Sequence, residues 1–192
     1  DLAIAETNTS YQNSGVSHRV RLVHRAEVSY TEQGFSADLN NLTGATDGYM
    51  DNVHALRNQY GADEVVLLIN DPSSCGLAWL MTTVSTSFAP NAFAVADQSC
   101  ATGYYSFSHE IGHNMGARHD RHVDTSNTPY DTSHGYVNVT GKWRTIMAYD
   151  DKCGASGTSC TRVQYWSNPD VTYKGGVMGV ATGSSSAADN RS

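Results

Sequence analysis

The sequence predicts an α/β fold in which a twisted mixed sheet with helices fills the first part of the chain and irregular segments fill the rest. Three observations support this. Residues 65–69, Val-Val-Leu-Leu-Ile, form an uninterrupted apolar run of strand length, which is typical of a strand buried on both faces. Residues 47–60 have a helical pattern instead, and beyond residue 119 Gly, Pro, Ser and Thr interrupt any regular pattern.

The regular elements are expected in a definite order along the chain. Residues 20–28 are predicted to form the first strand. A break that contains glycine leads to the helix at residues 47–60, which Gly61 ends, and the strands at 65–69 and 93–96 follow. The apolar side chains that can share one face of that helix are Met50, Val53, Ala55 and Leu56. A second helix is expected next, with Ser106 or Ser108 as its N-terminal cap.

Length and composition limit the class of protein. At 192 residues the chain fits one domain, or two subdomains around a cleft. A formal net charge of −7 with only 12 Lys and Arg residues argues against nucleic-acid binding. No apolar run reaches the roughly 18 residues of a membrane span, and residues 1–5 lack the basic start and apolar stretch of a signal peptide. We therefore expect no membrane association and a mature form from which the targeting segments have been removed.

The four cysteines allow three disulfide pairings if all are oxidised. We favour the pairs that join near neighbours in sequence, Cys75 with Cys100 and Cys153 with Cys160. The alternative, a second metal site, is disfavoured because the chain contains no Cys-x-x-Cys pair. Disulfides indicate an exported protein, and a monomer is expected.

The eleven residues from His109 to His119 carry the functional prediction. On a helix, His109 and His113 lie on one face and can point two imidazoles at one metal ion, with Glu110 beside a bound water. Gly116 allows a left-handed backbone that ends the helix, so that His119 can supply a third nitrogen. Three neutral nitrogens leave one position of a tetrahedral Zn²⁺ open, as in catalytic zinc sites. The other histidines fall outside this spacing and are not assigned to a metal: His18, His24, His54, His122 and His134.

A second run, Thr-Ile-Met-Ala-Tyr at residues 145–149, lies downstream. Together with the histidine motif it resembles the metzincin clan of zinc endopeptidases, in which a methionine-containing turn, here at Met147, lies beneath the metal. Asp120 is similar to the reprolysin (adamalysin) pattern, where this aspartate braces the turn. Tyr149 is similar instead to astacins and serralysins, whose tyrosine reaches the zinc or the transition state, and a buried structural phenol is the alternative. The end of the chain resembles bacterial secreted metzincins, of which the nearest group is the peptidyl-Asp metalloendopeptidases.

The resemblance covers about three quarters of the chain and implies a single catalytic domain with a cleft. The upper subdomain would span about residues 1–119 and the smaller, irregular lower subdomain about residues 120–192. Residues 63–70 would be the central strand of the upper subdomain, and residues 75–79 the edge strand that follows. A protein or peptide substrate would be added to this edge as an extended strand, along Gly76, Leu77, Ala78 and Trp79.

The resemblance also implies an activity, that of a secreted endopeptidase with one catalytic Zn²⁺ and a pro-segment that is removed. Glu110 would take the proton of the attacking water and pass it to the leaving amine, while Tyr149 would hydrogen-bond the oxyanion. Cleavage on the amino side of aspartate would need a cation near the Met-containing turn, for which the candidates are Arg144, Lys152 and Arg162.

Two other functions stay open from the sequence, a catalytically silent metzincin-like binding module and a zinc endopeptidase of broad specificity. The intact Glu110 argues against the binding module, because a binder does not need the base. Whether the Asp- and Asn-rich loops hold structural Ca²⁺ is also left open.

Overall fold

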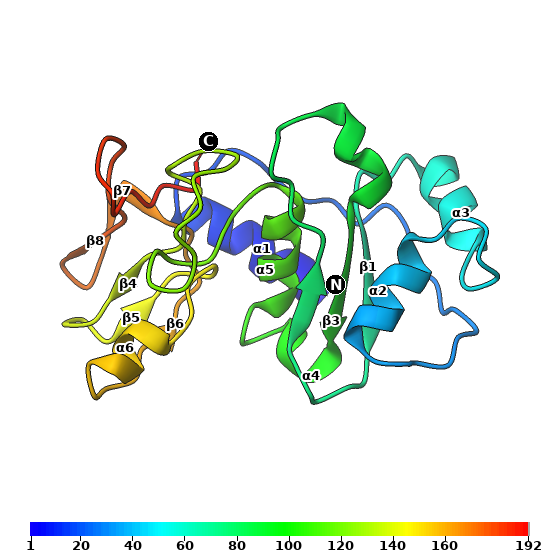
Figure 1. Ribbon diagram of the computed structural model, residues 1–192, viewed down its shortest axis with the longest axis horizontal. Helices are drawn as coiled ribbons and strands as arrows, with labels where there is room; N and C mark the ends of the chain where they lie inside the picture. Colours follow the sequence, from blue (N-terminus) through cyan, green and yellow to red (C-terminus); the bar gives the residue numbers. More distant parts are fainter. Residues whose placement is uncertain (192) are drawn as a thin grey trace.

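The structure, a computed structural model that describes residues 1–191, divides into a half built around a sheet and a half of short strands and loops (Figure 1). The helices are α1 (Leu2–Asn13), α2 (Phe35–Thr43), α3 (Asn52–Tyr60), α4 (Gln98–Ala101), α5 (Ser106–Asn114) and α6 (Asp151–Ala155), with a 3₁₀ helix η1 at Thr86–Asn91. The strands are β1 (Val65–Ile69), β2 (Gly76–Ala78), β3 (Phe93–Asp97), β4 (Val137–Asn138), β5 (Trp143–Arg144), β6 (Thr161–Arg162), β7 (Asn168–Tyr173) and β8 (Gly176–Met178).

The main sheet has three strands in the order β1–β3–β2. β3 lies in the middle, parallel to β1 and antiparallel to β2, and all five of its residues are buried. α2 and α5 pack against this sheet and lie on opposite sides of it in Figure 1. The predicted mixed α/β fold is confirmed. The prediction that residues 63–70 form the central strand is wrong, because β3 takes that place and β1 lies at an edge.

The strand at Val65–Ile69 forms as predicted, but its two faces are not both buried. Ile69 packs in the core with Phe93 and Val95, whereas Leu68 is 52% exposed. The apolar run at residues 65–69 therefore predicts more burial than β1 has, because an edge strand is covered less completely than a central one.

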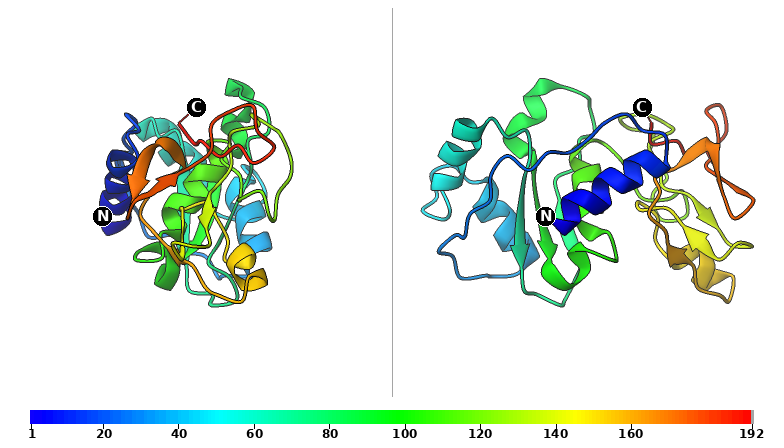
Figure 2. Two further views of the ribbon diagram at one scale, coloured as in Figure 1. Left: turned by 90° about the vertical axis from the view of Figure 1, so that its left-hand side faces the viewer. Right: turned by 180° about the vertical axis from the view of Figure 1, so that it is seen from behind.

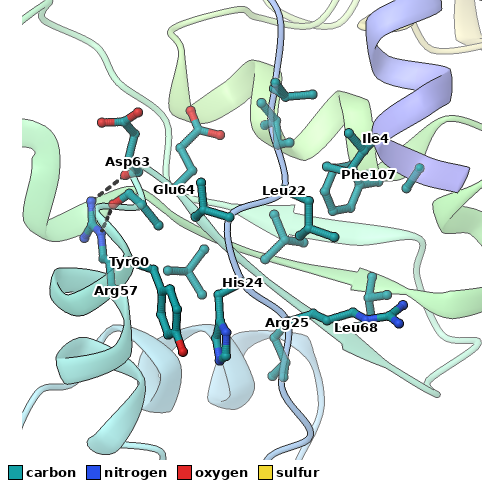
Figure 3. Close-up of a pocket in the computed structure, with 18 of the residues that line it drawn as sticks. Ile4, Leu22, His24, Arg25, Arg57, Tyr60, Asp63, Glu64, Leu68 and Phe107 are labelled. Atoms are coloured by element: carbon teal, nitrogen blue, oxygen red, sulfur yellow. Dashed lines mark hydrogen bonds between the residues drawn. The ribbon is translucent and has the colours of Figure 1, made fainter. Parts of the chain in front are cut away.

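The strand predicted at residues 20–28 does not form. The segment has no regular secondary structure, and its side chains line a cavity of about 1010 Å³ together with those of β1 (Figure 3). Leu22 and Leu68 face this cavity, which contains none of the three motif histidines. The apolar alternation of a strand is broken at Val23, which follows Leu22, and Arg21 remains exposed.

The predicted helix at residues 47–60 begins later than expected, as α3 at Asn52. Gly48 and Met50 both have positive φ, so the chain turns before the helix starts. Gly61 ends the helix in a left-handed conformation, as predicted. Met50 and Val53 enter the core, whereas Ala55 is exposed.

α1 was not predicted from the sequence. Its buried residues Thr7, Ser10 and Tyr11 have helical spacing, but two of them are polar, so an apolar pattern does not reveal the helix. Figure 2 shows α1 crossing α5, against which it packs, and extending toward the second half of the molecule. There Ser14, the residue after the helix, accepts a hydrogen bond from the backbone N–H of Trp166 at 2.7 Å.

The second half has the irregular character predicted from its composition. Its strands are short and form two small sheets, β4–β5–β6 and β7–β8. Both disulfides have the expected partners: Cys75–Cys100 joins the segment before β2 to α4, and Cys153–Cys160 links α6 to the segment before β6. No helix within residues 1–191 combines the length and the apolar character needed to cross a membrane.

Candidate metal centre

The three motif histidines converge on one point. The Nε2 atoms of His109 and His113 are 3.1 Å apart, and each lies 3.0–3.2 Å from Nε2 of His119. Tetrahedral ligands at about 2.0–2.1 Å from a zinc ion would be separated by about 3.3 Å. The spacing of the three nitrogens therefore suits a single small cation.

The hydrogen bonds of His109 and His113 fix which of their ring nitrogens carry protons. Nδ1 of His109 lies 2.9 Å from the backbone oxygen of Ile146, and Nδ1 of His113 lies 2.9 Å from that of Ala117. Because a carbonyl oxygen only accepts, these Nδ1 atoms donate, and the Nε2 atoms keep their lone pairs. Lone pairs that face one another at this distance repel unless a cation lies between them. The donor set thus fits a metal ion.

Burial keeps these imidazoles neutral, as metal ligation requires. It lowers the pKa of His113 to about 3 and that of His119 to about 4, and it holds the pKa of His109 well below its usual value. Like charges add to burial for His109 and His113, because each ring would face a second imidazolium.

The third histidine is brought in by the end of α5, as predicted. The helix ends at Asn114, and Gly116 follows with φ of +90°. The N–H of Ala117 returns to the carbonyl of Gly112 at 2.8 Å, which closes the turn and sends the chain back toward the metal centre. A side chain at Gly116 would also collide with Pro129. The predicted serine caps are wrong, because the N-cap is Tyr105, in a left-handed conformation, and Ser106 is already helical.

Glu110 lies on the same helix and is 5% exposed. Burial raises the pKa of its carboxyl to about 8, against the opposing charge of Arg162. The carboxylate lies directly against Gly76 in β2, where even a Cβ atom would overlap it. β2 therefore needs glycine at this position to leave room for the Glu110 carboxylate, a contact between residues 34 apart that the sequence does not reveal.

Met147 is fully buried beneath α5. It packs with Trp166 and Ile146, and a Cβ atom on Gly112 would lie 2.7 Å from the Met147 sulfur and 2.8 Å from Trp166. The turn that contains Met147 thus packs against α5 at Gly112, the one residue of this helix without a side chain. Trp166 and Gly112 are site-supporting residues that the motif alone does not identify.

Asp120 joins two turns at the centre. One carboxylate oxygen accepts from the backbone N–H of His122 at 3.0 Å, and the other accepts from that of Tyr149 at 2.9 Å. The ring of Tyr149 lies over His119, with 4.1 Å between centroids, and is 38% exposed. His134, buried nearby, places Nδ1 2.7 Å from the backbone oxygen of His119.

The other predicted substrate-contacting residues lie on or directly after β2, and on β5, β6 and α6. Gly76, Leu77 and Ala78 form β2, which within residues 1–191 pairs on one side only, with β3. Trp79 follows, with Nε1 donating to the Thr43 hydroxyl at 2.8 Å. The three candidate cations occupy different environments: Arg144 is buried in β5, Arg162 is partly buried in β6, and Lys152 is exposed on α6.

Apart from the three histidines, one further group in the described chain brings together potential metal ligands, namely Asp150, Cys153 and Cys160. The two cysteines are joined in a disulfide, so they offer no thiolate.

Comparisons with known proteins agree with this geometry. Residues 2–167 match a reprolysin-type model described as Metallo-peptidase family M12. A peptidyl-Asp metalloendopeptidase of Stenotrophomonas maltophilia strain R551-3 is 48% identical over 99% of this chain, and one of Pseudomonas fragi is 36% identical over 88%. The chain spans 43% of the length of the first relative and 85% of the second.

One solved structure, described as that of a chaperone-substrate complex, shares the fold with a TM-score of 0.64. It is 20% identical in sequence, and the match covers 98% of this chain and 31% of the other. The family match confirms the resemblance predicted from the motifs: the chain belongs to metallopeptidase family M12.

Proposed function

We propose that the chain is the catalytic domain of a secreted zinc endopeptidase that hydrolyses internal peptide bonds. The observation that carries the proposal is the convergence of three imidazole Nε2 atoms, together with a buried carboxylate on the helix that carries two of them. The relatives' printed name, metalloendopeptidase, supports the reaction class. The two disulfides support an extracellular location.

His109, His113 and His119 would hold the zinc. When bound, zinc supplies Lewis acidity that polarises the scissile carbonyl and makes water a stronger acid. Glu110 takes the proton of the attacking water at its carboxylate and returns it to the nitrogen of the leaving amine. Gly76 keeps that carboxylate in place by leaving it room.

The remaining residues hold and orient the peptide. The open edge of β2 offers backbone groups to an extended substrate, which would lie along the strand as an added neighbour. Tyr149 carries its phenol beside His119 and is open to solvent, so the hydroxyl is able to donate to the developing oxyanion. Met147 and Asp120 support the helix and the turns that hold these groups.

The proposal includes cleavage on the amino side of aspartate. The printed name of the relatives, peptidyl-Asp metalloendopeptidase, supports an aspartate preference. The alternative is an endopeptidase of broad specificity, which would cut regardless of the side chain that follows the scissile bond.

The test is a mass-spectrometric map of the cuts that the purified chain makes in a denatured protein mixture. We expect cleavage that stops with a zinc chelator and returns when zinc is added. Glu110→Gln should reduce the rate at least about 10²-fold while leaving zinc bound, because it removes the proton acceptor and keeps the shape.

The matched control is Glu27→Gln, at an exposed glutamate outside the site, which should cut like the parent. Full activity of the metal-free protein or of Glu110→Gln would contradict the mechanism. Absence of any cut by the zinc-loaded parent would favour the silent binding module.

A further inference from the structure

The structure distinguishes the three candidate cations that flank the Met147 turn. Arg144 is already occupied by its own chain. Its Nε donates to the Cys160 oxygen at 3.0 Å, Nη1 to the Ala148 oxygen at 2.6 Å and Nη2 to the Tyr104 hydroxyl at 2.9 Å. Because each guanidinium nitrogen has an acceptor and the side chain is 4% exposed, Arg144 fixes the turn and is not available to a substrate.

Lys152 is excluded for the opposite reason. It lies exposed on α6. Unlike Arg162, it is not among the leading charges that shift the pKa of Glu110, of Tyr149 or of the three histidines. A cation that selects a side chain next to the scissile bond should act strongly on these groups, which favours the partly buried Arg162 over the exposed Lys152.

Arg162 is both available to a substrate and close enough to act on the groups of the metal centre. Its charge acts on Glu110, His109, His119 and Tyr149, so the guanidinium lies within electrostatic reach of the metal centre. Its pKa is lowered to about 10 by burial and by the neighbouring charge of Arg144, yet it stays positively charged at neutral pH. Within residues 1–191 it forms no ion pair.

One side of the Arg162 guanidinium has no hydrogen-bond partner in the described chain. Nη1 donates to the Tyr104 backbone oxygen at 3.2 Å, and the guanidinium carbon lies 4.4 Å above the centre of the Tyr104 ring. Nε is buried without a hydrogen-bond partner in the described chain, and the one hydrogen bond that the Arg162 side chain makes there uses Nη1 and leaves Nη2 unpaired. Nε and Nη2 together form the side of an arginine that binds a carboxylate through two parallel hydrogen bonds.

We propose that Arg162, held in place by Tyr104, selects an acidic side chain on the residue that follows the scissile bond. This inference rests on the proposed endopeptidase function and names the group that gives it specificity. A partly buried cation with two free donors is unfavourable on its own, and a substrate carboxylate would satisfy both the charge and the hydrogen bonds. The chain as a whole carries a net charge of −7, which disfavours an acidic substrate side chain. A local positive charge such as that of Arg162 is therefore needed to bind one.

The experiment compares two peptides that differ only in the residue after the scissile bond, aspartate or its uncharged isostere asparagine. We expect the parent to prefer aspartate in kcat/KM by at least about tenfold. Arg162→Ala should bring this ratio close to one while the asparagine peptide is still cut. Arg162→Lys should keep part of the preference, because a lysine retains the charge without the paired donors.

Two controls and a second variant make the result decisive. Lys152→Ala and Arg21→Ala each remove an exposed positive charge and should leave the ratio as in the parent. Zinc content and circular dichroism check that each variant is folded, and Arg162→Gln, which keeps most of the side-chain bulk, replaces Arg162→Ala if the alanine variant does not fold.

The outcomes separate the two proposals. A ratio unchanged in Arg162→Ala or Arg162→Gln, or lost in Lys152→Ala instead, overturns the role of Arg162. A parent that cuts both peptides equally also overturns it but leaves the endopeptidase function intact. A zinc-loaded parent that cuts neither peptide, nor any other substrate, overturns the proposed function itself.

Discussion

At the scale of single residues, the metal-binding helix depends on the absence of a side chain at Gly112. A Cβ atom there would lie 2.7 Å from the Met147 sulfur and 2.8 Å from the Trp166 ring, and neither neighbour has free space because both are buried. We expect Gly112→Ala to lower the free energy of unfolding by about 1–3 kcal/mol, since the core must shift to accept the methyl group. Chemical denaturation measures this.

Gly154, in α6, is the matched control for this substitution. It is exposed, its φ is not positive, and nothing lies within 4 Å of an added Cβ atom. Gly154→Ala should therefore leave stability unchanged or raise it by about 0.5–1 kcal/mol, because alanine loses less backbone freedom in a helix. Equal losses in the two variants would show that the contact beneath α5 is not the cause.

At the scale of elements, the sequence predicted the strands and helices that are determined by local sequence patterns. The strands at Val65–Ile69 and Phe93–Asp97 follow from apolar runs, and α3 ends where Gly61 permits a left-handed turn. α1 has no such signal, because its buried face contains Thr7 and Ser10, which are buried by the partners they bond rather than by their own hydrophobicity. The order of the strands depends on tertiary contacts, and the central position that the family resemblance implied for residues 63–70 was wrong.

The start of β1 carries a titratable group with a consequence for stability. Burial and the charge of Asp63 raise the pKa of Glu64 from 4.5 to about 7, against the opposing charge of Arg57 (Figure 3). Between pH 4.5 and 7 the folded protein holds a proton that the unfolded chain has lost, so the stability contributed by the protonated carboxyl falls as the pH rises through this range.

Glu64→Gln should therefore be more stable than the parent at pH 8, on the order of 1 kcal/mol, and the difference should vanish near pH 4. Urea denaturation of both proteins at the two pH values gives the comparison, with Glu27→Gln as the control for loss of an exposed charge. A difference that is the same at pH 4 and pH 8 would exclude titration of Glu64 as its origin.

At the scale of the whole molecule, the metal centre combines a local part and a distant part. The three histidines and Glu110 fall within eleven residues, so their spacing on a helix and a turn predicted the converging nitrogens. The contacts of Gly76 with Glu110 and of Arg162 with Tyr104 join residues 34 and 58 apart. No spacing rule gives such pairs, and the sequence therefore offered three cations where the structure favours one.

α1 contacts both halves of the molecule, and this leads to a prediction for unfolding as a whole. Ser10, on the buried face of α1, accepts a hydrogen bond from the Trp166 indole N–H at 2.8 Å, and Trp166 packs beneath α5 with Met147. Ser10→Ala would leave that buried N–H without an acceptor, so we expect the free energy of unfolding to fall by about 1–3 kcal/mol. Thr9→Ala changes a neighbouring exposed hydroxyl on the same helix and should cost less than about 0.5 kcal/mol.

Because α1 contacts both halves, the parent should unfold in one calorimetric transition that Ser10→Ala shifts as a unit. Two transitions in the parent, of which only one responds to Ser10→Ala, would mean that the halves are stable separately and that α1 belongs to one of them alone.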